Sequence, residues 1–193
     1  MSQQSLNRRQ LLESTAIAAG VAAACSVATQ HATAAEAVRL TKDAAVLFQG
    51  DSITDAGRAR GTKNQPNQPR AMGNGYPMLI GCELLRDHAK LGLRVFNRGI
   101  SGNKVPDLQA RWQQDCIDLA PSLLSVLIGV NDIWHKLNGR YEGTVADYQR
   151  EFANLIEETR KALPQTTIVI CEPFVLRCGA VKENWFPEFD QRR

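Results

Sequence analysis

The stretch Val46-Leu-Phe-Gln-Gly-Asp-Ser-Ile-Thr-Asp55 decides the fold. Its first three residues form a short apolar run, which is typical of a strand buried in a parallel sheet. Gly50 permits an abrupt turn directly after this strand, and Ser52 follows where the strand ends. Because ligand sites in open α/β sheets gather at such strand ends, Ser52 is a candidate nucleophile. The alternative is that Asp51 or Ser52 only caps the next helix.

Two later segments repeat this arrangement of an apolar run followed by Gly and Asn. They are Asn97-Arg-Gly-Ile-Ser-Gly-Asn103 and Ile128-Gly-Val-Asn-Asp132. Because parallel strands end at the same edge of a sheet, we expect the three strand ends to meet at one rim. Ordinary turn chemistry is the alternative, since Gly and Asn are common after strands.

The chain resembles the SGNH hydrolases, also called GDSL-type esterases and lipases, in three ordered blocks: Gly50-Asp51-Ser52, Gly102 and Gly129-Val130-Asn131-Asp132. The resemblance implies that Ser52 attacks an acyl carbonyl and forms an acyl-serine intermediate. It also implies three oxyanion donors, which are the N–H of Ser52, the N–H of Gly102 and the side-chain amide of Asn131. Removing one such donor typically costs about 10²- to 10³-fold in rate.

The family activates its serine with a histidine from an Asp-x-x-His block near the C-terminus. No such block follows the last predicted strand, so we expect an incomplete family member that lacks the last strand and helix. Asp132-Ile-Trp-His135 has the right spacing, but it directly follows Asn131, so His135 would approach from the side of the oxyanion donors. We therefore expect Asp51, Asp132 and His135 to contact substrate at the rim. Loop packing and a general-base role both stay open for His135.

Strand-like and helix-like patterns alternate along the chain, which favours a parallel sheet between two helical layers. Together with the resemblance, this predicts a flavodoxin-like three-layer α/β sandwich. The expected strands are residues 45–49, 94–97, 123–128 and 166–171. Three helical stripes are interpreted as core packing: Leu79, Cys82, Leu85 and Ala89; Val105, Leu108, Trp112 and Cys116; and Tyr148, Phe152, Leu155, Ile156 and Leu163.

Residues 56–75 are expected to form a long loop beside the rim. The loop contains no acidic residue and four cations, which are Arg58, Arg60, Lys63 and Arg70. It is interpreted either as a solvated loop or as a lid for an acidic or hydroxyl-rich substrate. Trp185 and Phe186 are interpreted either as a wall for an acyl chain or sugar, or as a cap on the core.

The N-terminus has features of an export signal. Arg8 and Arg9 precede an uncharged, Ala-rich stretch, which resembles a twin-arginine signal, and Ala32-Thr33-Ala34 offers a cleavage site. We interpret residues 1–35 as the signal and residues 36–193 as the hydrolase domain, placed in the periplasm or outside the cell. Lipidation at Cys25 and an ordinary Ala-rich helix are the alternatives. The stretch is a poor membrane anchor, so no stable span is expected.

Composition excludes several other classes of function. With 23 basic and 20 acidic side chains, the formal charge of +3 gives no basic face for nucleic acid. No phosphate-binding glycine loop or metal-ligand spacing is present, so we expect no metal and no cofactor. Buried free thiols are expected for Cys82, Cys116 and Cys171, with a bridge from Cys171 to Cys178 left open.

The sequence thus predicts an exported serine esterase that acts on a small-molecule ester or an acylated carbohydrate. One alternative is a non-catalytic remnant, able at most to bind a sugar or acyl ligand. Another is a flavodoxin-like binding module unrelated to hydrolysis, which the Asn131 block argues against.

Overall fold

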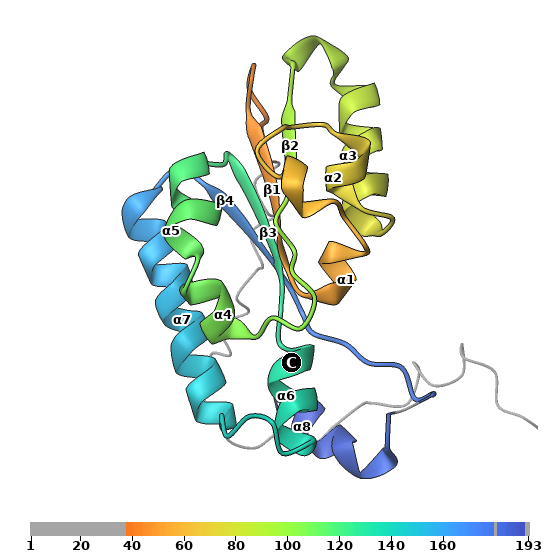
Figure 1. Ribbon diagram of the computed structural model, residues 1–193. Coiled ribbons are helices and arrows are strands. Elements are labelled where there is room, and N and C mark those ends of the chain that lie inside the picture. The colour runs from red at the N-terminus through yellow and green to blue at the C-terminus, as the bar shows by residue number, and fades with distance from the viewer. Residues whose placement is uncertain (1–37, 180, 192–193) are drawn as a thin grey trace, which may run out of the picture. The chain divides into compact units, whose positions relative to one another are not determined.

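The computed structural model describes residues 38–179 and 181–191. The predictions about the export signal, including Cys25 and the cleavage site, lie outside the described residues. Four parallel strands form one sheet in the order β2-β1-β3-β4 (Figure 1). They are β1 (Ala45–Gly50), β2 (Arg94–Asn97), β3 (Leu123–Leu127) and β4 (Thr167–Cys171). Each predicted strand agrees with the structure to within one residue at either end.

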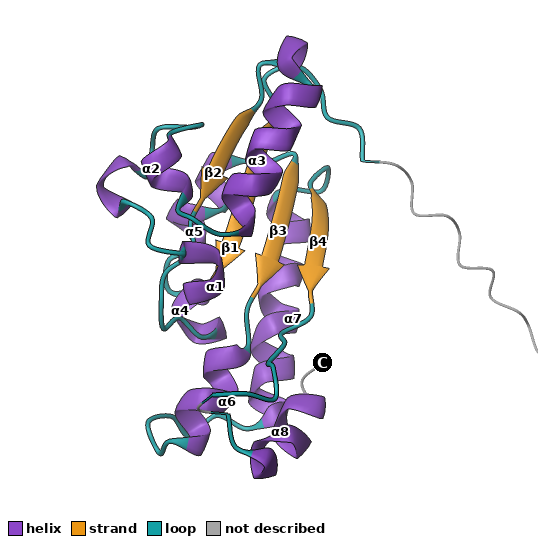
Figure 2. Cartoon of the chain, turned by 90° about the vertical axis from the view of Figure 1, so that its right-hand side faces the viewer, coloured by secondary structure: helices purple, strands orange, loops and turns teal. Residues whose placement is uncertain are grey.

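Helices cover both faces of this sheet, which confirms the three-layer α/β fold. Figure 2 shows α3 on the near side of the sheet and α7 behind it. The α-helices are α1 (Ser52–Asp55), α2 (Pro69–Met72), α3 (Tyr76–Asp87), α4 (Val105–Gln109), α5 (Trp112–Asp115), α6 (Val130–Leu137), α7 (Val145–Ala162) and α8 (Phe186–Asp190). Single 3₁₀ turns are η1 (Arg60–Thr62), η2 (Ala89–Leu91), η3 (Ile117–Leu119) and η4 (Glu183–Trp185). Across the described ranges, no helix is both long enough and apolar enough to cross a membrane.

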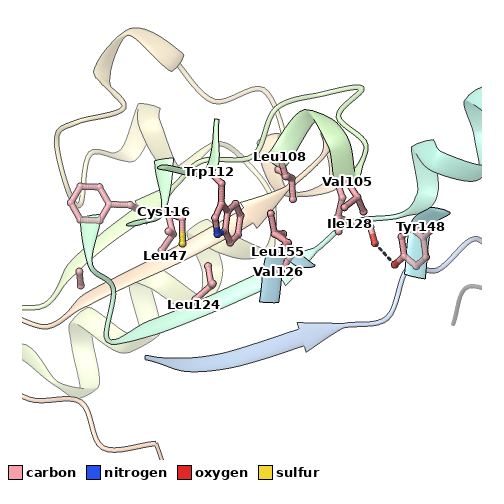
Figure 3. Close-up of a cluster of buried hydrophobic side chains, with 12 residues drawn as sticks. Leu47, Val105, Leu108, Trp112, Cys116, Leu124, Val126, Ile128, Tyr148 and Leu155 are labelled. Atoms are coloured by element: carbon pink, nitrogen blue, oxygen red, sulfur yellow. Dashed lines mark hydrogen bonds between the residues drawn. The ribbon is translucent and has the colours of Figure 1, made fainter. Parts of the chain in front are cut away.

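The central strand β1 supplies side chains to two cores, which explains its continuous apolar run. Leu47 packs into the cluster beneath α4, α5 and α7 together with Trp112 and Leu124 (Figure 3). On the opposite face, Phe48 packs with residues of α2 and α3. All six residues of β1 are buried, so the strand is fixed on both faces and along both edges.

The helix predicted from Val105 to Cys116 is divided into α4 and α5, although its apolar stripe is buried as expected. The chain leaves helical geometry at Arg111, where ψ is 7°. The guanidinium of this residue donates to the side chains of Gln49 and Asn103 at 3.1 and 3.0 Å. The break therefore occurs at Arg111, whose side chain hydrogen-bonds to residues near the strand ends.

The buried face of α3 was predicted only in part, because Leu85 packs against the core cluster as expected but the other three residues of the stripe are exposed. Leu79 is 69% exposed and Cys82 is also exposed, whereas Pro77 and Gly81 are buried. A Cβ added to Gly81 would lie 3.4 Å from a methyl group of Val95 on β2. The helix thus approaches the sheet through its smallest residue, with Leu84 and Leu85 packed against the core cluster and Leu79 facing solvent.

The four cysteines that the structure describes are free, and of these only Cys116 is buried. Cys171 is partly buried and not bonded to Cys178, which is exposed. The expectation of a buried thiol is therefore wrong for Cys82, because it followed from the incorrect face of α3.

Candidate active site

Ser52 begins α1 directly after β1, and its side chain is exposed. The turn between them depends on the absence of a side chain at Gly50, because an added Cβ would lie 2.3 Å from the carbonyl oxygen of Leu127 on β3. Asp51 caps the helix by accepting a hydrogen bond from the backbone N–H of Ile53 at 3.0 Å. The hydroxyl of Ser52 is therefore presented at the carboxyl edge of the sheet.

The carboxyl group of Asp51 is only 1% exposed. Its Oδ2 atom has no hydrogen-bond partner among the described residues. Burial raises the pKa of Asp51 to about 6, against the opposing effect of the hydrogen bond from Ile53. These contacts favour a role in holding the turn over contact with substrate.

The loop after β2 is tied to the nucleophile turn. The side chain of Asn97 donates to the carbonyl oxygen of Thr54 at 2.6 Å. The backbone N–H of Ile100 donates to the carbonyl oxygen of Gly50 at 3.0 Å. Gly102 follows with a φ of +86°, and no heavy atom lies within 4 Å of the position its Cβ would take. The N–H of Gly102 thus belongs to an open turn next to α1.

The loop after β3 is joined to the loop after β2 through two side chains of α6. The amide of Asn131 donates to the carbonyl oxygen of Asn103 at 3.0 Å, and the carboxylate of Asp132 accepts from the N–H of Val105 at 3.2 Å. The bond to Asn103 fixes the amide of Asn131, which keeps a second N–H. Asp132 is 1% exposed, so its contacts also favour positioning of a loop.

The structure therefore brings Ser52, Gly102 and Asn131 to the same edge of the sheet. Figure 1 shows α1 and α6 at this edge, below β1 and β3. In the order β2-β1-β3, β2 lies on one side of β1 and β3 on the other, so the direction of the strand order reverses at β1. Open α/β sheets usually bind ligands at such a reversal.

The structure describes two histidines, and neither is a hydrogen-bond partner of the Ser52 hydroxyl. In the part of the chain that the structure describes, neither His88 nor His135 hydrogen-bonds to Ser52. His88 is exposed at the end of α3. His135 is partly exposed on α6, and burial together with the charges of Lys104 and Arg140 lowers its pKa.

The segment of residues 56–75 is anchored through three of its cations, although many of its residues are exposed. Arg58 is 6% exposed and donates through Nε to the carbonyl oxygen of Gly99 at 2.6 Å. Arg60 pairs with Asp55, and Lys63 pairs with Asp115 at 3.1 Å. The interpretation of a solvated loop therefore holds only in part: Arg58 is buried and acidic partners outside the loop pair with Arg60 and Lys63, whereas Arg70 is exposed.

Asp115 is a buried carboxylate that sequence reasoning missed. It also accepts a hydrogen bond from Arg111 at 3.0 Å, and it lies 3.8 Å from the guanidinium of Arg98. Burial alone would raise the pKa of Asp115, but the bonds from Arg111 and Lys63 lower it below its usual value. The only local signal was the four-residue spacing between Arg111 and Asp115.

The aromatic residues near the C-terminus pack against α6. The ring of Trp185 is 4.9 Å from that of Trp134 in an edge-to-face arrangement, and Trp185 is 6% exposed. An ion pair of 3.1 Å between Lys136 and Glu188 joins α6 to α8. Of the two predicted roles, the contacts of Trp185 fit the cap on the core.

A cavity of about 650 Å³ opens between β4 and α7. Its lining includes Phe152, Ile156 and Ile170 but none of Ser52, Gly102 and Asn131. It is therefore separate from the candidate active site.

A model of the GDSL-like lipase/acylhydrolase family matches residues 48–193, which include all three sequence blocks. The chain belongs to this family. The resemblance noted from Ser52, Gly102 and Asn131 is thereby confirmed at the level of the family.

Two relatives show how far the likeness extends. An acetylxylan esterase of Geobacillus stearothermophilus is 36% identical over 135 residues, which cover 68% of this chain and 60% of that protein. The uncharacterized lipoprotein YqeF of Bacillus subtilis is 26% identical over 92 residues, covering 48% of this chain and 38% of that protein. The match thus spans less than two thirds of each relative.

Solved structures share the fold. A candidate GDSL-like lipase from Parabacteroides merdae is 47% identical with a TM-score of 0.78, covering 81% of this chain and 72% of that chain. The Geobacillus acetylxylan esterase is 32% identical with a TM-score of 0.68, covering 79% and 69%. Variants of that esterase with a serine, an aspartate or a histidine replaced are described as catalytic mutants.

Proposed function

We propose that this chain is a serine esterase that hydrolyses carboxylic esters through an acyl-serine intermediate. The observation that carries the proposal is the exposed hydroxyl of Ser52 at the same sheet edge as Gly102 and the anchored amide of Asn131. Membership of the GDSL-like family supports this assignment.

In the proposed reaction, Oγ of Ser52 attacks the carbonyl carbon of the ester. The carbonyl oxygen becomes an oxyanion, which accepts hydrogen bonds from the N–H groups of Ser52 and Gly102 and from the second N–H of Asn131. Collapse of the tetrahedral intermediate breaks the bond to the alcohol, which leaves with the proton lost by Ser52. Water then attacks the acyl-serine, releases the carboxylic acid and returns the proton to the serine oxygen.

This reaction requires a base to take the proton of Ser52. The catalytic mutants of the acetylxylan esterase support a serine, histidine and aspartate set in the family. Within this chain, His135 is the candidate to be tested. Asp51 and Asp132 are proposed to hold the loops that carry Ser52 and Asn131, since both carboxyl groups are buried.

The proposed substrates are small, soluble esters, with acetylated carbohydrates first among them. The likeness to an acetylxylan esterase supports this choice. The signal-like N-terminus, together with a relative named as a lipoprotein, supports an exported protein in the periplasm or outside the cell.

The test uses the full chain with a nitrophenyl acetate substrate and a fluorophosphonate probe. We expect turnover and labelling in the unmodified protein, and loss of both in Ser52→Ala. Asn131→Ala should lower kcat by about 10²- to 10³-fold, with circular dichroism showing an unchanged fold. Turnover that survives Ser52→Ala would refute the proposal.

The second candidate function is a non-catalytic protein that binds a sugar or acyl ligand at the same edge. It is favoured by the absence, in the described part of the chain, of a hydrogen bond from histidine to Ser52. A folded protein that neither labels nor turns over would support this candidate. If turnover is present, His135→Ala decides whether that imidazole is the base.

A further inference from the structure

Asp55 connects the nucleophile helix to the loop that contains Gly102. It is the last residue of α1 and is 2% exposed. Its Oδ2 atom accepts hydrogen bonds from the backbone N–H and the hydroxyl of Ser101, both at 2.9 Å. Its Oδ1 atom accepts from the N–H of Arg58 at 3.2 Å, and Arg60 forms an ion pair with the same carboxylate. One side chain thus joins three segments of the rim.

The contact between these segments is close. A Cβ added to Gly99 would lie 2.4 Å from the backbone nitrogen of Asp55. The loop after β2 therefore rests directly on the last turn of α1. The carboxylate of Asp55 holds this loop at Ser101, one residue before Gly102.

The carboxylate is held in its charged form. Burial opposes ionisation of Asp55, but the bonds from Arg60 and Ser101 lower its pKa below the usual value. Hydrogen bonds to an ionised acceptor are about twice as strong as those between neutral groups. The Ser101 contacts are therefore strong enough to fix a turn that has little packing of its own.

Gly102 depends on such contacts because nothing packs against the position of its missing side chain. On its N-terminal side the chain is held at Ser101 by Asp55. On its C-terminal side it is held at Asn103 by the amide of Asn131. Two side chains, one on α1 and one on α6, thus hold the residues on either side of Gly102, in addition to the turn hydrogen bond from the N–H of Asn103 to the carbonyl oxygen of Ile100 at 3.1 Å.

We propose that Asp55 is a positioning residue that holds Ser101 so that the N–H of Gly102 keeps its place beside Ser52. The proposal rests on the proposed function, in which that N–H stabilises the oxyanion. It assigns the carboxylate no contact with substrate. Its effect is expected on kcat, because the oxyanion forms only during the reaction.

The experiment compares Asp55→Asn and Ser101→Ala with the matched control Asp115→Asn. Asp115 is also a buried carboxylate paired with a cation of the same loop, but its bonds go to Lys63 and Arg111. Nitrogen relaxation of the full chain gives the backbone order parameter of Gly102. We expect Asp55→Asn to lower it from about 0.85 toward the flexible range below about 0.6, and Asp115→Asn to leave it unchanged.

With nitrophenyl acetate, Asp55→Asn should lower kcat by at least about 10-fold, toward the loss of one oxyanion donor, while KM changes little. Ser101→Ala keeps the backbone bond, so both readouts should change in the same direction but less. It also replaces Asp55→Asn as the decisive variant if that protein fails to fold.

The proposal is overturned if Gly102 has the same order parameter in the Asp55→Asn or Ser101→Ala protein as in the Asp115→Asn control. A mobile Gly102 with unchanged kcat would overturn it as well. If the unmodified protein has no esterase turnover, the proposed function fails by itself. The order parameter of Gly102 then still decides whether Asp55 positions this turn.

Discussion

Replacement of Asp51 by asparagine should stabilise the protein at neutral pH but not in acid. The folded protein buries the carboxyl group of Asp51, with one oxygen unpartnered among the described residues, and its pKa rises from 3.8 to about 6. Between these two pH values the folded state binds the proton that the unfolded chain releases. The free energy of unfolding therefore falls as pH rises through this window and becomes level above it.

The size of the effect follows from the two pKa values. One pKa unit corresponds to about 1.4 kcal/mol, so the change from 3.8 to about 6 corresponds to about 3 kcal/mol at neutral pH. At pH near 4, most of this difference is absent because the carboxyl group is largely neutral in the folded state. Asparagine keeps a side-chain oxygen for the N–H of Ile53 and does not titrate. The advantage of Asp51→Asn should thus grow by about 2–3 kcal/mol from acid to neutral pH.

Urea unfolding of both proteins, at several pH values from about 4 to about 7.5, measures this difference. Asp87→Asn is the control, since Asp87 is exposed and its pKa is lowered by the hydrogen bond from Arg86. It should show no gain in stability at neutral pH. A constant difference between Asp51→Asn and the unmodified protein across the pH range would refute the reasoning.

Other predictions concern the core. Thr159→Val removes the buried partner of the Trp112 indole N–H, which lies 2.9 Å from its hydroxyl, and should lower the free energy of unfolding by about 1–3 kcal/mol in urea. Leu155→Ala should cost about 2–5 kcal/mol because the side chain is fully buried, whereas Leu79→Ala on the exposed face of α3 should change it by less than about 0.5 kcal/mol. Burial raises the pKa of Cys116 to about 12, so mass spectrometry should find its thiol unmodified by maleimide until the protein unfolds.

The strands could be predicted because each carries a short apolar run, although only β1, β2 and β3 are mostly buried and β4 is largely exposed. The face of α3 was predicted only in part, since Gly81 packs against the sheet and Leu85 against the core while Leu79 faces solvent. Hydrophobic periodicity assumes that large side chains mark the buried face. A glycine that admits close helix packing reverses that assumption.

The parts of the candidate site that follow strands could be predicted from the sequence, whereas the contacts that join distant segments could not. Gly102 and Asn131 follow apolar runs, so a local pattern places them at strand ends. The contacts of Asp55 with Ser101 and of Lys63 with Asp115 join distant parts of the chain. Because these pairs have no local periodicity, the cations of residues 56–75 resembled a solvated surface.

The central place of β1 has a consequence for biosynthesis. This strand leaves the ribosome before its three neighbours, yet one of its edges can pair only after β3, which begins at Leu123, has been made. Such long-range parallel pairing is slow and leaves apolar segments open to aggregation in the meantime. Nascent chains that carry β1 without β3 should therefore bind chaperones, and release from them should follow translation of β3.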